Sequence, residues 1–219
     1  MKKIFVLLVS FLLLSTTMAL AGGFIPRYGD SVKYFGIGVY FAPKNIKIYA
    51  QPNIKSNPVS FFQWNEFGVS QNNEELSSRN LFLAFDAEKE IALMAVTDET
   101  EGWYEVVYNQ QTGDKGWIKD TQPTHFLSWL DFMMSFGRNN KIYLFSDLPE
   151  EYRILRTSPE EGSQALKSTN YSPENIKLIY IRGNWMLVRA LDYAKQDSFI
   201  GWIRWRSDDG TIFAFPYLK

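Results

Sequence analysis

The chain has 219 residues, of which 46% are hydrophobic and 21% are charged, a composition typical of a folded globular protein rather than a disordered one. Its 23 basic and 24 acidic residues nearly balance and form no basic run, which argues against nucleic acid as a partner. The absence of cysteine excludes disulfides and cysteine-dependent catalysis.

The N-terminus has the three parts of a secretory signal peptide. Lys2 and Lys3 form a charged start, Ile4 to Leu14 an apolar run, and Ala19 to Ala21 a small-residue cleavage site. Residues 1–21 are therefore predicted to be removed, and the mature chain to be exported to the periplasm or the extracellular space. The alternative is an uncleaved anchor, although the run is shorter than the roughly 20 residues of a spanning helix. We expect no membrane span after cleavage.

Two stretches of the chain are similar to each other. Residues 102–119 consist of a strand that begins Gly-Trp, a polar turn, and a strand that begins Gly-Trp-Ile-Lys. Residues 183–204 repeat this order with Gly-Asn-Trp and Gly-Trp-Ile-Arg. Upstream of each lies an alternating strand that ends at a proline turn, at 46–53 and at 153–159. The simplest interpretation is two copies of one β-rich module.

Three further elements are predicted from local patterns. Between the two copies, apolar residues spaced by three and four predict a helix from His125 to Phe136, with Thr124 as N-cap and Gly137 after its end. Residues 65–80, rich in Asn, Glu and Ser, are expected to form a long loop. The Asp-Gly pair within residues 205–213 predicts a tight hairpin.

The order of these elements resembles the bacterial SH3-like domain, SH3b. An alternating strand before a proline turn, followed by Gly-Trp-aromatic-x-Val, a turn and Gly-Trp-Ile, carries the resemblance over residues 46–120 and 152–206. It implies a mainly β chain with two small SH3-like antiparallel β-barrels joined by a short α-helix. The long segment 65–80 and the C-terminal hairpin depart from the family pattern. The expected domains are a signal peptide (1–21), a first module with an N-terminal extension (22–121), a linker helix (122–138) and a second module with a C-terminal hairpin (139–219).

Strand alternation places two tryptophans of each module on the more polar face. Trp103 shares a side with Glu105, and Trp185 shares a side with Arg189, because successive side chains point in opposite directions. Half-exposed aromatic rings beside charges can stack on sugars or hold an extended peptide. A second interpretation is that these rings are covered by the barrel rim, the helix or the other module. The candidate binding residues are Tyr49, Trp103, Trp117, Trp185 and Trp202.

The side chains of common catalytic sites are scarce. His125 is the single histidine, there is no Gly-x-Ser-x-Gly sequence, and the paired glutamates fall in polar turns. We therefore expect no catalytic residue, no metal and no cofactor. The SH3b resemblance implies a non-enzymatic exported protein that binds cell-wall peptidoglycan, by its glycan or its peptide, or an envelope protein.

Two alternatives remain open at this stage. One is a protein–protein adaptor of the cell envelope that docks through the helix at Phe126, Leu130 and Met133. The other is a cell-wall hydrolase with an unrecognised carboxylate site.

Overall fold

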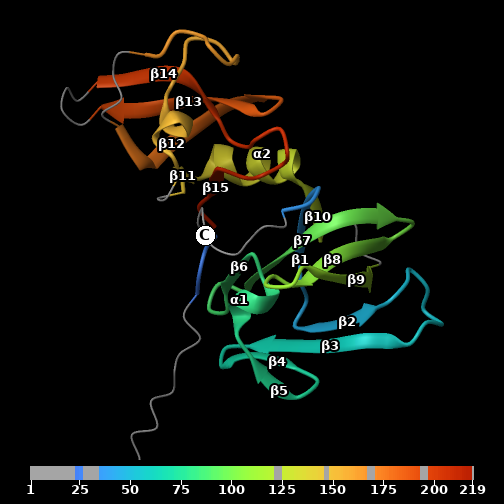
Figure 1. Cartoon of the computed structure of the whole chain (residues 1–219). Coiled ribbons are helices and arrows are strands. Elements are labelled where there is room, and N and C mark those ends of the chain that lie inside the picture. The colour runs from blue at the N-terminus through green and yellow to red at the C-terminus, as the bar shows by residue number, and fades with distance from the viewer. Residues whose placement is uncertain are drawn as a thin grey trace, which may run out of the picture.

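The computed structural model describes residues 23–26, 35–120, 125–145, 148–166, 171–192 and 197–218. Within these ranges the chain is mainly β, as expected, and forms two antiparallel sheets with helix α2 (Trp129–Asn139) between them (Figure 1). The predicted signal peptide and its cleavage site lie outside the described residues.

The first sheet, which we call sheet A, contains ten described strands. They are β1 (Gly38–Phe41), β2 (Asn45–Tyr49), β3 (Pro58–Asn65), β4 (Gly68–Gln71), β5 (Glu74–Leu76), β6 (Ala84–Asp86), β7 (Ile91–Thr100), β8 (Trp103–Asn109), β9 (Asp114–Lys119) and β10 (Phe126–Ser128), with helix α1 (Ser78–Leu81) before β6. The spatial order is β10-β1-β7-β8-β9-β2-β3-β4-β5, and β6 pairs with β7.

The second sheet, sheet B, contains five described strands in the order β14-β13-β12-β11-β15. Their bounds are β11 (Ile142–Leu144), β12 (Tyr171–Arg182), β13 (Trp185–Asp192), β14 (Asp197–Arg204) and β15 (Ala214–Pro216), and the 3-10 helix η1 (Glu150–Arg153) follows β11. Neither sheet closes into a barrel within the described residues.

The two sheets share one strand order. The path β10-β1-β7-β8-β9 of sheet A corresponds to β15-β11-β12-β13-β14 of sheet B. In each sheet, a segment that comes earlier in the chain pairs with the last strand of this path at one position. The paired residues are Tyr49 and Trp117 in sheet A, and Arg156 and Trp202 in sheet B. The pairing register also shifts at the same place, opposite Val106 in sheet A and opposite Val188 in sheet B.

The shared strand order, bridge and register shift allow the two sheets to be aligned position by position. Residues that occupy matching positions in the two registers are called equivalent below. The equivalent pairs used here are Thr97 and Ile179, Asp98 and Tyr180, Trp103 and Trp185, Glu105 and Leu187, Lys115 and Ile200, Trp117 and Trp202, Lys119 and Arg204, and Tyr49 and Arg156.

Helix α2 is part of the core that joins the sheets. Trp129, Phe132 and Met133 are at most 1% exposed and belong to one apolar cluster with residues of both sheets. The Trp129 indole donates a hydrogen bond to the Phe35 carbonyl at 2.8 Å, which satisfies its buried N–H. A second cluster lies within sheet A and includes Tyr40, Ile46, Ile48, Phe62, Trp64, Val106 and Ile118.

The helix between the copies begins later than predicted. Phe126 and Leu127 belong to β10 and pair with β1, so their apolar side chains are part of a sheet edge rather than the first helical turn. Ser128 is the N-cap, and its hydroxyl accepts a hydrogen bond from the Asp131 N–H at 3.1 Å. Thr124, the predicted cap, lies outside the described residues. Gly137 lies inside the helix, where a Cβ atom would come within 2.9 Å of the Ile142 Cδ1 atom.

The segment predicted as a long loop is instead part of sheet A. Residues 65–80 contain β4, β5 and the first residues of α1. Asn72 and Asn73, with φ angles of 50° and 71°, make the tight turn between the two strands, a conformation that asparagine tolerates better than most residues. The polar composition therefore reflects solvent-exposed strands and a turn.

The C-terminal Asp-Gly turn forms, but it does not add a full strand pair. Gly210 has a φ angle of 90°, and the Ser207 N–H donates to the Thr211 carbonyl at 2.9 Å. The arms pair at a single bridge between Arg206 and Ile212. The chain then continues into β15, which pairs with β11.

Candidate functional site

A pocket lies in sheet A where β2 separates from β9. The two strands pair only at Tyr49 and Trp117, and the remainder of β2 pairs with β3. The space between the separating strands is a pocket of about 340 Å³, which we call the first pocket. Its lining includes Tyr40, Lys47, Tyr49, Lys119, Asp120 and His125.

Sheet B has a pocket at the equivalent place. Arg156 and Trp202 form two backbone hydrogen bonds of 2.8 Å, and the segment before Arg156 then separates from β14. The resulting second pocket has a volume of about 280 Å³. Its lining includes Tyr152, Ile154, Arg156, Glu161, Trp185 and Arg204.

A cation lies over a tryptophan ring at the same position in both modules. The Lys119 Nζ atom is 5.2 Å from the ring centroid of Trp103, and the Arg204 Cζ atom is 5.2 Å from that of Trp185. Such cation–π contacts favour a fixed position for the charged group. Each pocket therefore presents a cation that is held on an aromatic ring.

The interpretation of the tryptophans as covered side chains holds for one tryptophan of each pair. Trp103 and Trp185 are only 6% and 8% exposed, so for these two rings the half-exposed interpretation is wrong. Trp117 and Trp202 are half-buried. Trp103 and Trp185 are covered in part by the cation on the neighbouring strand, because Trp103 lies opposite Lys119 and Trp185 opposite Arg204.

Three of the candidate residues lie together in sheet A. The Tyr49 ring meets the Trp103 ring edge-on, with 5.5 Å between centroids, and Tyr49 pairs with Trp117 across the strands. In sheet B, Trp185 and Trp202 have the same arrangement, but Arg156 replaces the tyrosine.

The sequence interpretation missed several lining residues. Lys119 and Arg204 each follow a Gly-Trp-Ile sequence, so the repeat itself contained the signal for them. Tyr40, Asp120 and His125 come from separate segments and had no local signal, because only the folded chain brings them together.

A buried carboxylate organises the first pocket. Asp120 is 9% exposed, and its Oδ2 atom is 2.9 Å from the His125 Nδ1 atom. Asp120 also interacts with the Tyr40 hydroxyl. Burial and the negative charge of Asp120 raise the pKa of Tyr40, so this phenol stays protonated. The Asp120 carboxylate thus holds an imidazole and a phenol at the pocket wall.

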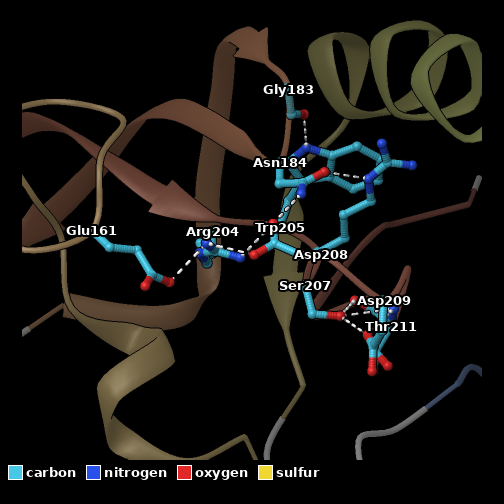
Figure 2. A network of polar contacts seen from close by, with 10 residues as sticks. Glu161, Gly183, Asn184, Arg204, Trp205, Ser207, Asp208, Asp209 and Thr211 are labelled. Atoms are coloured by element: carbon cyan, nitrogen blue, oxygen red, sulfur yellow. Dashed lines mark hydrogen bonds and ion pairs between the residues drawn. The ribbon is translucent and has the colours of Figure 1, made fainter.

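Two lining residues of the second pocket, Glu161 and Arg204, belong to a network of polar contacts (Figure 2). Arg204 lies between two carboxylates, with its Nη2 atom 2.7 Å from Glu161 Oε1 and its Nη1 atom 3.3 Å from Asp208 Oδ1. The Asn184 side chain donates to Asp208 at 2.8 Å and accepts from the Arg206 Nε–H at 2.6 Å. The hydrogen bonds from Asn184 and Arg204 lower the pKa of Asp208. The guanidinium group of Arg204 is consequently held between Glu161 and Asp208.

The groups present are suited to recognition by hydrogen bonds, charges and aromatic contacts. Among the described residues, no set of three histidine or carboxylate side chains is placed to hold a metal ion. Within the same ranges, no helix is long and apolar enough to cross a membrane.

No family model matches the chain, and no curated protein matches it significantly in sequence.

Proposed function

We propose that this chain is an exported, non-enzymatic binding protein whose two SH3-like modules recognise cell-wall peptidoglycan, by its glycan or its peptide, through the first and second pockets. The observation that carries this proposal is the equivalent position of the two pockets in two sheets of the same strand order. The SH3b resemblance and the predicted signal peptide support it.

The chemistry of the pockets fits a polymer with rings, amides and charges of both signs. The first pocket combines aromatic residues with Lys119 and Asp120, and the second combines Trp185 with Arg204 and Glu161. Peptidoglycan carries sugar rings as well as free amino and carboxylate groups on its peptides. Both pocket volumes lie near the lower end of the range for ligand sites, which suits one sugar ring or a short peptide segment.

Two pockets on one chain also favour a repeating ligand. After one repeat of a polymer is bound, the second pocket meets the next repeat at a high effective concentration. Weak individual pockets can then produce strong retention on an insoluble polymer.

The two alternative functions have less support. Docking through the helix requires exposed apolar residues, but Met133 is fully buried and Phe126 is partly buried, and only Leu130 is exposed. A glycoside hydrolase generally needs two carboxylates about 5 to 9 Å apart. The first pocket is lined by one, Asp120, and the second by two, Glu151 and Glu161, of which Glu161 is engaged by Arg204 at 2.7 Å.

Retention of the purified mature chain on peptidoglycan sacculi tests the proposal. We expect the wild-type chain to sediment with sacculi and a K119E/R156A double variant, changed in both pockets, to bind about tenfold or more weakly. Lys115→Glu is the matched control, because Lys115 is exposed on the same strand but does not line the pocket. Failure of the wild-type chain to sediment, or equal retention of the double variant, would refute the proposal. Thermal melting of each variant checks that the fold is kept.

A further inference from the structure

The outer face of sheet B exposes a continuous apolar surface. Ile179, Tyr180 and Ile200 are 36%, 51% and 49% exposed, and Leu187 and Trp202 are half-buried. Tyr180 pairs with Leu187, which pairs with Trp202, so these three side chains lie side by side across β12, β13 and β14. We call these five residues the β12–β14 face.

Cations flank the β12–β14 face at both ends. Lys177 and Arg189 are opposite each other in the row that Ile200 completes on β14, and Arg182 and Arg204 lie in the row on the other side of Tyr180, Leu187 and Trp202. Four to five residues separate the two rows along a strand, which corresponds to roughly 13 Å. Lys177, Arg182 and Arg189 are exposed. Of these four, only Arg204 forms an ion pair with a described residue.

Sheet A shows that the strand framework does not need these apolar residues. In sheet A, polar or charged residues occupy four of these positions. They are Thr97, Asp98, Glu105 and Lys115, in place of Ile179, Tyr180, Leu187 and Ile200. Only the tryptophan, Trp117 or Trp202, is common to both. A polar set thus supports the same register and bulge, so the exposed apolar set of sheet B requires a reason other than folding.

The cationic rows are also specific to sheet B. Ala95 and Val107 occupy the positions of Lys177 and Arg189, and both are fully buried in the core cluster that contains α2. On sheet B the same positions face solvent and carry positive charge.

The arrangement limits which partner can cover this face. Two copies placed face to face would bring cation against cation. Sheet A of a second copy is also a poor partner. Its corresponding face has one half-buried aromatic residue, Trp117, to pack against the five apolar side chains. A flat stack on sugar rings is also disfavoured, because the Tyr180 and Trp202 rings are inclined at 82° to each other.

An anionic bilayer matches both parts of the surface. Lipid phosphates attract cations near the surface, and tyrosine and tryptophan favour the boundary between headgroups and acyl chains. The apolar side chains can enter this boundary while Lys177, Arg189 and Arg182, which form no ion pair with a described residue, stay at the level of the phosphates. We propose that the β12–β14 face docks the protein on an anionic phospholipid bilayer, a property separate from recognition by the two pockets.

Sedimentation with vesicles tests this proposal. The chain that begins at Gly22, with its N-terminus verified by mass spectrometry, is mixed with vesicles of phosphatidylglycerol and phosphatidylcholine or of phosphatidylcholine alone. We expect binding only to the anionic vesicles and weaker binding as the salt concentration rises. Removing two cations by K177Q/R189Q should weaken binding by about 30-fold.

Exchange of residues between equivalent positions provides a matched test of the apolar centre. The Y180D/I200K variant places the side chains of sheet A in sheet B, and binding should fall by about tenfold or more. Ile54→Lys is the control, because Ile54 is 68% exposed but belongs to the segment between β2 and β3.

Several outcomes would overturn the proposal. Equal binding to neutral vesicles, or no loss of binding in either double variant, contradicts an anionic membrane partner. A concentration-dependent dimer that Y180D/I200K abolishes, without vesicle binding by the wild-type chain, would assign the face to self-association. The same variant should keep its retention on sacculi, so failure of the pockets and failure of this face are distinguishable.

Discussion

Tyr40, in the first module, shows how the burial of one side chain makes the stability of the fold depend on pH. It is 1% exposed, its hydroxyl interacts with Asp120, and its ring packs near Tyr104 and His125. Ionising this phenol would place a second negative charge in the core beside Asp120. The folded state therefore holds the Tyr40 proton more strongly than the unfolded state does.

This difference predicts a loss of stability in alkali. An unfolded tyrosine ionises near pH 10, whereas folded Tyr40 has a raised pKa, so its contribution is complete below about pH 10 and is lost as the pH rises further. The free energy of unfolding, measured in urea at about pH 8 and pH 11, should fall less in Y40F than in the wild-type chain. Tyr180→Phe removes an exposed phenol and serves as the control. An equal fall in Y40F and wild type would contradict this account.

Among the strands, β9 and β14 show why glycine precedes tryptophan in the repeated Gly-Trp-Ile sequence. A Cβ atom on Gly116 would lie 2.3 Å from the Ile48 Cγ2 atom and 3.0 Å from the Tyr49 carbonyl oxygen. On Gly201 it would lie 2.6 Å from the Leu166 Cδ1 atom. In each module the glycine leaves room for a crossing segment beside the pocket.

These contacts predict unequal effects of alanine at the two glycines. Gly116→Ala should reduce the free energy of unfolding by about 1–3 kcal/mol, because a backbone oxygen as well as a buried side chain opposes the added methyl group. Gly201→Ala should cost less, because the nearest atom is the end of the flexible Leu166 side chain. Urea unfolding measures both, with Lys115→Ala on the same strand as Gly116 as the control. A wild-type value for G116A would show that β2 can move away.

At the scale of the whole molecule, helix α2 makes the two sheets interdependent. Its buried residues share one cluster with sheet A on one side and sheet B on the other. Phe132 is fully buried and packs against both Phe41 and Phe215, with ring centroids 6.3 and 5.2 Å away. Although the repeat suggests two modules, this packing favours a single folding unit.

Cooperative unfolding is the expected consequence. Tryptophan fluorescence and far-UV circular dichroism should report one coincident transition in urea. Phe132→Ala should lower the free energy of unfolding by about 3–5 kcal/mol and shift both signals together. Leu130→Ala, on the exposed side of the same helix, should change it by less than about 0.5 kcal/mol. Two separate transitions, or a shift of only one signal in F132A, would show that the sheets unfold independently.

Local patterns in the sequence determined much of the β structure. Alternating residues and glycine turns placed the strand pairs that begin at Trp103 and Trp185, and the inward positions of Ile118 and Ile203, which are 4% and 0% exposed. These features were predictable because strand alternation and turn formation depend on neighbouring residues. The start of α2 was not, since Phe126 and Leu127 fit a helical pattern but pair with a strand distant in sequence.

The candidate site depended more on the tertiary structure. The sequence placed Tyr49 and the tryptophans of each module near one another, but burial of Trp103 and Trp185 follows from contacts across strands and with cations. The cluster of Tyr40, Asp120 and His125 forms only when three segments meet.

By itself, then, the sequence determined a mainly β chain with a repeated strand motif and the aromatic residues available to it. Only the tertiary structure decided which rings are covered, where the pockets lie and which sheet face stays exposed. The reason is physical: alternation assigns a residue to one side of a strand, whereas its exposure depends on what packs against that side. In this chain the same side is buried in sheet A at Val107 and open to solvent in sheet B at Arg189.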